Sequence, residues 1–237
     1  MRVIALPDVH IPYHDVRSWN LALEVVDYLK PKHVIQLGDL ADNRPFSRHK
    51  PKYGERRDPE HDMAVVRDEV AKLEAASSGK LTCLAGNHDY WYYNYVAEQA
   101  PALTKHVLTL GQAYGLRREP VPYHEILKIG KVGYVHDLGH AGKTALRQTL
   151  EAAGHCIVFG HTHRAGVEYT GDAHGRRWFS MSCGWLGDAS KINYMPQAKT
   201  REWQTGFGVI DYDSSIAYAR FIPIIDGRCQ IDGKRFK

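Results

Sequence analysis

The sequence lacks the features that mark membrane, secreted and disordered proteins. None of its apolar runs reaches the roughly 18 residues of a membrane-spanning helix, and its opening segment turns polar too early for a secretory signal peptide. The four cysteines show no paired spacing of the zinc-ribbon or redox kind. A composition of 43% hydrophobic and 24% charged residues excludes collagen, coiled coil and disorder. We therefore expect a soluble cytoplasmic protein with buried free thiols and no membrane contact.

Length and charge set further bounds. With 237 residues, the chain fits one large domain over residues 1–237, because single hydrophobic cores stop growing at roughly 250–300 residues. We find no internal repeat and no low-complexity segment. The net charge of +4 is a mild basic excess, compatible with phosphate-bearing partners. The 14 histidines direct attention to metal binding, because histidine is the commonest metal ligand.

The order of apolar segments predicts an α/β protein. In residues 1–160, short apolar runs that end in polar clusters alternate with segments of helical spacing. The predicted strands are 3–6, 33–37, 81–85, 132–136 and 156–159, and the predicted helices are 19–29, 63–73 and 145–153. After Gly160 the pattern changes to strands at 166–170, 177–182, 206–212 and 216–225, with no further helices. This order favours two packed β-sheets flanked by helices.

Nearly every predicted strand of the first part ends in residues that can bind a metal. The oxygen and imidazole donors at these strand ends are Asp8, His10, Asp39, Asn87, His88, His136, His161 and His163. Ligands of open α/β sheets gather outside the carboxyl ends of the strands. We therefore expect these residues, remote in sequence, to converge on one site.

The individual motifs differ in specificity. Asp8-Val9-His10 and Gly38-Asp39 are each common in turns. The segments 86–89 (Gly-Asn-His-Asp) and 160–163 (Gly-His-Thr-His) are more specific. Two histidines one residue apart at a strand end are poor core residues, because imidazole needs polar partners.

The four motifs occur together and in order, and in this combination the sequence resembles the calcineurin-like metallophosphoesterase superfamily. That family is marked by D-x-H, G-D-x-x-D, G-N-H-D/E, a lone His after a strand, and G-H-x-H. Here the pattern is supplied by Asp8 and His10, by residues 38–42, by residues 86–89, by His136 and by residues 160–163. The resemblance covers roughly residues 1–170 and implies a β-sandwich with helices outside. Residues 203–211 resemble the last strands of small stand-alone members from phages and bacteria.

The resemblance also implies a ligand scheme. It assigns Asp8, His10 and His163 to a first metal ion, Asn87, His136 and His161 to a second, and Asp39 to a bridging position between them. The two ions would be divalent transition metals, because the ligands are nitrogen and oxygen without thiolate. Mn is the expected ion in vitro, with Fe, Zn and Ni as alternatives. Such a pair clamps a phosphoryl group and lets a bridging hydroxide act as nucleophile.

The resemblance places His88 near the leaving-group oxygen, as a general acid or as a positively charged hydrogen-bond donor. Asp42 is the predicted partner that orients His88, and its alternative is a loop cap. His136 is preferred as the lone ligand because it ends an apolar run. His140 is the other candidate for this ligand position. If it is not the ligand, we expect it to contact the substrate or to be exposed to solvent.

Two features near the motifs concern the substrate. Protein phosphatases of this superfamily carry Arg directly after the second Asp of G-D-x-x-D, whereas this chain has Asn43 and then Arg44. Residues 44–57 are strongly basic, so Arg44 and Arg48 are candidate phosphate contacts, with a solvated charged loop as the alternative. The aromatic residues at 91–95 either stack bases or, for Trp91 and Tyr95, pack a helix face. Trp185 either rims the site or covers the sheet.

Three functions remain open at this point. The leading hypothesis is a two-metal phosphodiesterase acting on a nucleotide or nucleic-acid substrate. The second is a phosphomonoesterase, which would share every ligand. The third is a non-catalytic scaffold that keeps the fold for protein binding, although scaffolds tend to lose ligands and none of the expected ligands is missing here. The oligomeric state does not follow from the sequence.

Overall fold

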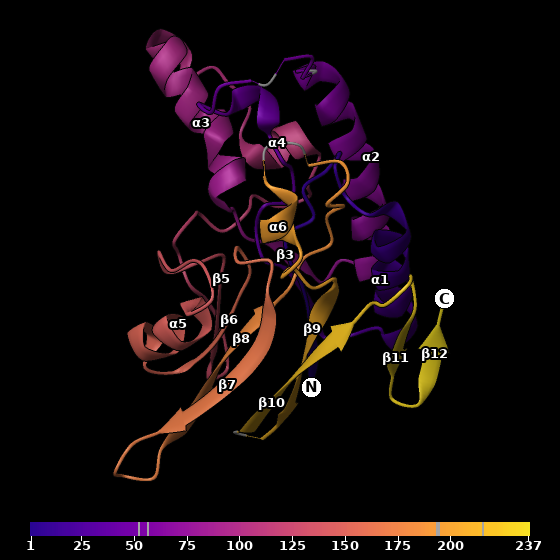
Figure 1. The fold of residues 1–237 in the computed structure, drawn as a ribbon, viewed down its shortest axis with the longest axis vertical. Helices are drawn as coiled ribbons and strands as arrows, with labels where there is room; N and C mark the ends of the chain where they lie inside the picture. Colours follow the sequence, from indigo (N-terminus) through magenta and orange to yellow (C-terminus); the bar gives the residue numbers. More distant parts are fainter. Residues whose placement is uncertain (52, 56, 193–194, 215) are drawn as a thin grey trace.

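Two mixed β-sheets form the centre of the protein (Figure 1). The computed structural model describes residues 1–237 apart from 52, 56, 193–194 and 215. The first sheet has the strand order β10-β9-β1-β2-β3 and the second has the order β4-β5-β6-β8-β7. In the first, β1 (Arg2–Leu6), β2 (His33–Gln36) and β3 (Leu81–Cys83) are parallel, β9 (Gly206–Asp213) is antiparallel to β1, and β10 (Ile216–Pro223) is antiparallel to β9.

The second sheet repeats this plan. Its parallel strands are β5 (Val132–Val135), β6 (Cys156–Phe159) and β8 (Arg177–Cys183), and its antiparallel edges are β4 (Leu127–Ile129) and β7 (Ala165–Gly171). Parallel strands point their carboxyl ends to one edge of a sheet. Each sheet therefore brings several strand ends to one place, where the candidate site lies.

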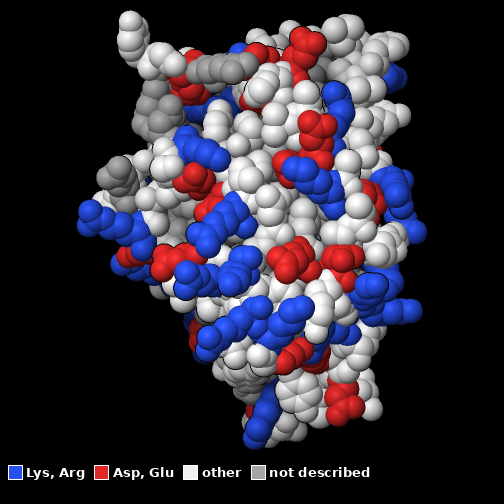
Figure 2. Space-filling view, turned by 90° about the vertical axis from the view of Figure 1, so that its right-hand side faces the viewer, with Lys and Arg blue, Asp and Glu red and all other residues white. Residues whose placement is uncertain are grey.

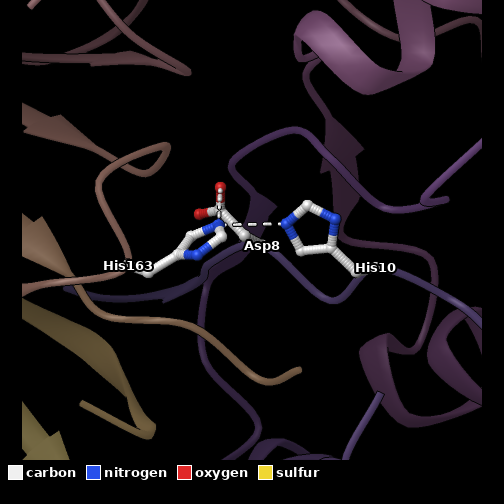
Figure 3. A group of neighbouring side chains, drawn as sticks. All are labelled: Asp8, His10 and His163. Carbon is white, nitrogen blue, oxygen red and sulfur yellow. Dashed lines mark hydrogen bonds and ion pairs between the residues drawn. The ribbon is translucent and has the colours of Figure 1, made fainter. Parts of the chain in front are cut away.

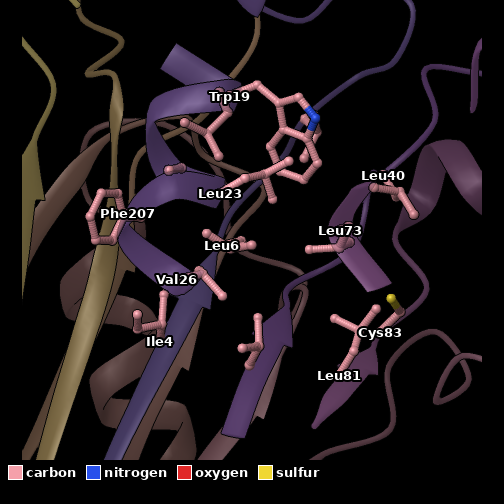
Figure 4. Close-up of a cluster of buried hydrophobic side chains, with 14 of the residues drawn as sticks. Ile4, Leu6, Trp19, Leu23, Val26, Leu40, Leu73, Leu81, Cys83 and Phe207 are labelled. Atoms are coloured by element: carbon pink, nitrogen blue, oxygen red, sulfur yellow. The ribbon is translucent and has the colours of Figure 1, made fainter. Parts of the chain in front are cut away.

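Alternation along the strands builds the hydrophobic layers. In β1, Val3 and Ala5 belong to the apolar layer between the sheets, whereas Ile4 and Leu6 face the opposite way. Ile4 and Leu6 pack beneath α1 (Val16–Leu29) together with Trp19 (Figure 4). A strand buried on both faces needs an unbroken apolar run, because successive side chains point to opposite faces.

Helices cover the outer faces of both sheets. The outer face of the first sheet is covered by α1 and α2 (Pro59–Ser77), which are joined where the Trp19 indole N–H donates to the Glu69 carboxylate over 2.9 Å. The outer face of the second sheet is covered by α5 (Ala145–Ala153), packed against Val135, Ile157 and Phe159. The result is the helix, sheet, sheet, helix arrangement predicted from the sequence.

Helix boundaries follow local chemistry. Helix α1 begins at Asp15, whose carboxylate accepts from the Ser18 N–H over 3.0 Å, and Pro31 follows its last turn. Helix α2 begins at Asp58 with Pro59 in its first turn. Both helices were predicted, although α2 extends beyond the predicted 63–73 at both ends.

Other elements were not predicted. They are η1 (Arg44–Phe46), α3 (Asn87–Gln99), η2 (Pro101–Leu103), α4 (Leu110–Tyr114), β4, β11 (Cys229–Ile231) and β12 (Lys234–Phe236). The expectation of no helix after Gly160 is wrong, because residues Gln197–Thr200 form the short helix α6. A single turn is too short to leave a helical period in the sequence.

The surface over α1, α2 and the β11–β12 hairpin carries both signs of charge. Figure 2 views this side of the molecule and shows Lys and Arg side chains interspersed with Asp and Glu. The mild basic excess of the chain is therefore not gathered into one basic face on this side. Among the described residues, no helix combines the length and the apolar character needed to cross a membrane.

Candidate metal centre

The predicted ligands converge at the carboxyl ends of the parallel strands. Asp8 and His10 follow β1, Asp39 follows β2, and Asn87 begins α3 just beyond β3. From the second sheet, His136 follows β5, and His161 and His163 follow β6. Asp8, His10, Asp39 and His136 are almost completely buried. Among the described residues, three overlapping groups of side chains could hold a metal ion: Asp8, His10 and His163; His10, Asp39 and His88; and Asp39, His136 and His161. Together they contain every predicted ligand except Asn87.

One group consists of Asp8, His10 and His163 (Figure 3). The Nε2 atoms of His10 and His163 face each other over 3.0 Å, and His163 Nε2 lies 3.5 Å from Asp8 Oδ1. Two imidazole nitrogens and a carboxylate oxygen thus point to one small region. This set matches the first metal position that the family resemblance implied.

A second group contains Asp39, His136 and His161. His136 Nε2 lies 3.3 Å from Asp39 Oδ2 and 3.0 Å from the Asn87 side-chain oxygen. The same Asn87 oxygen lies 3.0 Å from His161 Nδ1. Asn87 therefore joins this group through its oxygen, the only metal-binding atom of the amide.

Asp39 lies between the two groups. Its Oδ2 is 3.3 Å from His136 and 4.0 Å from His10, and its Oδ1 accepts a hydrogen bond from the His88 backbone N–H over 2.8 Å. One carboxylate thus faces both sets of imidazoles. This is the placement that a bridging ligand requires.

Hydrogen bonds behind the ligands orient two of the imidazoles. His10 Nδ1 donates to Asp42 Oδ2 over 3.1 Å, and His136 Nδ1 donates to the Leu37 carbonyl oxygen over 2.9 Å. In each ring the other nitrogen, Nε2, is then directed into the site, where it can bind a metal ion in place of its proton. Metal-binding histidines are commonly held in this way.

The electrostatics of the site favour a cation. Burial disfavours the Asp39 carboxylate, but the charges of His136 and His88 hold its pKa well below the ordinary value. The His163 hydrogen bond and nearby imidazoles likewise keep the pKa of Asp8 low against the effect of burial. Burial opposes protonation of His136, yet the Asp39 charge raises its pKa to about 10. The site therefore contains ionised carboxylates that attract positive charge.

For His163 the balance is different: burial outweighs the nearby Asp8 carboxylate and lowers the His163 pKa to about 4. A neutral imidazole is the form that binds a metal. Ionised carboxylates, an amide oxygen and oriented imidazoles together fit divalent cations of the kind bound by nitrogen and oxygen. The donor set thus agrees with the predicted divalent metal chemistry.

The backbone at the site is held in unusual conformations. His10, Asp39, Asn43, His161 and His163 all have positive φ, between 49° and 64°. Non-glycine residues seldom adopt this region, and clusters of such residues are typical of functional sites. The loops after β1, β2 and β6 are therefore shaped to present ligands at some conformational cost.

Two motif glycines are required by close approach to the carboxylates. A Cβ added to Gly86 would collide with Asp39, and one added to Gly160 would lie 2.5 Å from Asp8 Oδ2. The Gly160 loop is also held by the His161 N–H, which donates to both Asp8 oxygens over 2.8 and 3.0 Å. Each glycine thus lets one loop pack against a ligand from another strand.

Comparison with known proteins agrees with this geometry. The family model described as calcineurin-like phosphoesterase matches residues 1–165. The chain belongs to this family. The Gene 54 protein of Mycobacterium phage D29 is 27% identical over 256 residues, with 98% of this chain and 97% of the phage protein covered. The Gene 54 protein of Mycobacterium phage L5 is 26% identical over 255 residues, with the same coverage. The predicted similarity to small stand-alone phage members is confirmed.

Solved structures show the same fold. Vps29 of Cryptosporidium parvum has a TM-score of 0.55 and 16% identity, over 99% of this chain and 97% of that one. A single mutant of Vps29 from Entamoeba histolytica has a TM-score of 0.54 and 14% identity, over the full length of both chains. At these identities the likeness concerns the fold alone, and it confirms the predicted metallophosphoesterase architecture.

The arrangement around His88 differs from the predicted contact. The carboxylate of Asp42 binds His10, whereas the Asp42 backbone carbonyl accepts from His88 Nδ1 over 2.8 Å. The Asp42 carboxylate is 3.6 Å from the same His88 nitrogen. Asp42 thus orients His88 mainly through its backbone, an interaction that residue identity does not reveal.

A supporting network behind α3 was missed in the sequence. Asp89 accepts from the Gly86 N–H over 2.8 Å and from the Tyr114 hydroxyl over 2.9 Å. Asn43 donates its side-chain amide to Tyr114 over 2.6 Å and to the His88 carbonyl over 3.0 Å. Asn43 therefore ties the Asp39 loop to the first turn of α3. Tyr114 comes from α4, and its distance along the chain concealed this role.

The basic segment 44–57 is folded around an acidic residue. Arg44 is only 3% exposed and binds the Glu55 carboxylate through Nε and Nη2 over 2.7 and 3.0 Å. Arg57 also donates to Glu55, over 3.1 Å. The predicted substrate contact by Arg44 gains no support, because its guanidinium holds the loop together. Lys52 and Arg56 lie outside the described residues.

Arg48 is placed differently. It is exposed and lines a hollow of about 160 Å³ together with Asn87 and Trp91. His140 is partly buried in the loop before Ala141, which lines a second hollow. Of the three predicted substrate contacts, Arg48 is the one that lines a hollow next to a ligand residue.

Two tryptophans cover His163. Trp185 is 3% exposed and stacks on the His163 ring with centroids 5.0 Å apart. Trp203 meets the same ring edge-on at 4.3 Å. Trp185 is therefore buried against the predicted ligand His163 and is not an exposed residue at the rim of the site.

Trp203 also borders the second hollow, of about 600 Å³, together with His88, Lys143, Arg164 and Lys199. His88 was predicted as part of the 86–89 motif. Arg164 directly follows the 160–163 motif but was not predicted, and neither were Lys143 and Lys199, which lie away from every motif.

The expected packing of Trp91 and Tyr95 is wrong. They lie on α3, but Tyr95 is 44% exposed and Trp91 is only partly buried. Trp91 stacks on His88 with ring centroids 3.8 Å apart. Asp89 is the only described residue of α3 that is fully buried. The aromatic residues of the helix are therefore at most partly buried: Tyr90, Tyr92 and Tyr93 pack against the core, whereas Trp91 lies on His88 and Tyr95 is exposed.

Proposed function

We propose that the protein is a two-metal phosphodiester hydrolase. The observation that carries the proposal is the convergence of seven donors into two groups that share the Asp39 carboxylate. The first ion would be held by Asp8, His10 and His163, and the second by Asn87, His136 and His161. Mn is the ion we expect to support activity in vitro, with Fe, Zn and Ni as alternatives.

Ions bound there would supply Lewis acidity to a phosphoryl oxygen and lower the pKa of water. The chain itself prepares the site for this charge. Asp42 and the Leu37 carbonyl hold the rings of His10 and His136, so that their Nε2 atoms face inward. Ligands held in this way need little rearrangement when the substrate reacts.

His88 is the proposed proton donor to the leaving-group oxygen. Its Nδ1–H donates to the Asp42 carbonyl, which leaves Nε2 for the substrate side. Nε2 donates a proton only when the ring is doubly protonated, a form that burial disfavours and the Asp39 charge favours. Trp91 covers one face of the ring and limits its rotation. The backbone N–H of His88 is bound to Asp39, so the residue is fixed relative to the ligands.

A diester is favoured over a monoester by the shape of the surface. Two separate hollows border the cluster, one of about 600 Å³ at His88, His161 and His163 and one of about 160 Å³ at Asn87. A phosphodiester has two ester arms and can place one in each hollow, whereas a monoester has one. A phosphomonoesterase, the second hypothesis from the sequence, would leave one hollow without a function.

The proposal is tested by comparing hydrolysis of bis-p-nitrophenyl phosphate and p-nitrophenyl phosphate in the presence of Mn²⁺. We expect the wild type to prefer the diester, and Asp39→Asn to lose at least about a hundredfold in rate, because the ligand between the two groups loses its charge. Asp68→Asn makes the same chemical change on the exposed surface of α2 and should retain full activity.

Bound metal should be counted in the same three proteins. Loss of metal and of rate in Asp39→Asn alone would support the assignment. Unchanged diester hydrolysis in Asp39→Asn would refute it. A wild type that binds no Mn²⁺ and hydrolyses neither ester would favour the scaffold hypothesis.

A further inference from the structure

Helix α3 carries a continuous stripe of aromatic and polar residues that begins at a proposed metal ligand. Residues spaced three and four apart share one face of a helix. On this face lie Asn87, Tyr90, Trp91, Asn94, Tyr95 and Glu98. In most surface helices such a stripe would be apolar and would face the core. Here all six residues line a hollow, and Asn94, Tyr95 and Glu98 are exposed.

The hollow beside the stripe has aromatic walls. Phe46 of η1 meets the Tyr95 ring at 5.6 Å, and Tyr123 meets the Tyr90 ring at 5.5 Å. Arg48 adds a positive charge to the rim. The space of about 160 Å³ is suited to one flat ring system, with amide and carboxylate groups of Asn94 and Glu98 at its edge.

The stripe is continuous with the metal centre. Asn87 begins it and lies 3.0 Å from both His136 Nε2 and His161 Nδ1. Trp91, one turn further, stacks on His88. From Asn87 to Glu98 the helix rises by roughly 16 Å, at about 1.5 Å per residue. A group attached to a phosphate at the metals can therefore lie along this face.

We propose that the α3 stripe binds the nucleoside arm of the diester substrate, with its base against Tyr95 and Phe46 and with Arg48 beside the next phosphate. This inference rests on the proposed phosphodiesterase function. Aromatic faces next to a basic side chain are the usual means of holding an unpaired base. Asn94 and Glu98 offer hydrogen bonds to a base edge, which an apolar peptide would not use.

The test compares two chromogenic diesters with the same leaving group, thymidine 5′-(p-nitrophenyl phosphate) and methyl p-nitrophenyl phosphate. We expect the wild type to prefer the nucleoside ester and Tyr95→Ala to lower kcat/KM for it roughly five- to tenfold, as expected for loss of part of a base stack. Hydrolysis of the methyl ester should not change. Tyr218→Ala removes a similarly exposed tyrosine from β10 and is the matched control.

A second measurement distinguishes nucleotides from nucleic acid. Titration of wild type and Tyr95→Ala with thymidine 5′-monophosphate and with a six-residue oligothymidylate, followed by calorimetry, should show weaker binding to the variant. Tighter binding of the oligonucleotide, with a further loss in Arg48→Ala, would identify single-stranded nucleic acid as the source of the base.

The outcomes separate the two proposals. If Tyr95→Ala loses the methyl and nucleoside esters equally, or if neither thymidine ligand distinguishes it from wild type, the stripe is not a nucleoside site, although diester hydrolysis stands. If, in addition, another protein binds to this chain through α3, the stripe is a protein-binding surface and not a nucleoside site. Failure of the wild type on both esters would overturn the phosphodiesterase function itself, independently of Tyr95.

Discussion

The protein contains two clusters of aspartates with basic partners, and they differ in burial. At the metal centre, Asp8 and Asp39 are buried among imidazoles. At the far end of the first sheet, Asp211 and Asp232 bind Arg2 and Arg220 on the surface, with side chains 26–42% exposed. The same kinds of charge are therefore placed in very different surroundings.

This difference shows how burial changes the role of a carboxylate. In the surface cluster, guanidinium groups satisfy the carboxylates, and solvent screens each pair. In the buried cluster, imidazole nitrogens and carboxylate oxygens point into the same small region, and a metal ion bound there would take the place of the imidazole protons. Arg44 and Glu55 fall between these cases, because their ion pair is buried but lies in a surface loop. Three predictions test this ordering.

The largest effect is expected for Gly160→Ala, which adds a methyl group against Asp8. Displacement of this ligand should weaken metal binding roughly tenfold or more, and crowding should cost about 1–3 kcal/mol of unfolding free energy. Metal titration and thermal melting would measure both. Gly154→Ala is the control for metal binding, because that glycine ends α5 with a φ of 63°, so alanine strains the backbone there without meeting any atom near the site. If Gly160→Ala binds metal like wild type, the close packing at Asp8 does not matter.

An intermediate effect is expected for Glu55→Gln. The change leaves Arg44 buried beside a neutral partner, and breaking a buried pair costs roughly 3–5 kcal/mol where the structure cannot relax. Because the loop can open locally, we expect faster proteolysis and hydrogen exchange in residues 44–57, with little change in global melting. Glu151→Gln, which breaks the exposed pair with Arg147, should change neither quantity. Equal protection of the loop in both variants would show that this pair contributes little.

The smallest effect is expected for Asp211→Asn. Burial opposes ionisation of this carboxyl, but hydrogen bonds from Arg2 and Arg220 hold its pKa below the ordinary value. A lowered pKa in the folded state stabilises the fold above the unfolded value, about 3.9, and this contribution is lost as the pH falls through the folded value. The variant should lose less than about 1 kcal/mol at pH 7, and this loss should shrink as the pH falls below the unfolded value.

Urea denaturation of wild type and Asp211→Asn across this pH range would measure that difference. A gap between the two proteins that widens on acidification would contradict the expected direction of the pH dependence. A loss at pH 7 as large as that of Gly160→Ala would remove the contrast between the surface and buried clusters.

Much of the ligand cluster could be predicted because each ligand directly follows an apolar strand. Parallel strands bring their ends to one edge, so Asp8, Asp39 and His136 meet although they are far apart in the chain. The glycines of the motifs are explained by the structure, since Gly86 and Gly160 approach carboxylates from other strands. The α/β class and the two-sheet arrangement followed from the same strand pattern.

The roles of the residues around the ligand cluster could not be predicted in this way. Arg44 looked like a phosphate contact because its neighbours are basic, but its partner Glu55 decides its role through the fold of the loop. Trp91 and Tyr95 have the spacing of a buried helix face, yet within the described part of the chain this face of α3 stays largely outside the core. Helical spacing indicates which residues share a face, and it does not say whether another element packs on that face.

The sequence by itself determined the family, the two-sheet fold and the side chains that converge at the candidate metal centre, because these depend on local order: an apolar strand, a glycine and a donor. Only the tertiary structure decided that Asp42 binds His10 through its carboxylate and His88 through its carbonyl, and that Trp185 and Trp203 cover His163. It also decided that α3 leaves its aromatic stripe beside the candidate metal centre. These features arise from contacts between distant segments, and such contacts form only when the whole chain is packed.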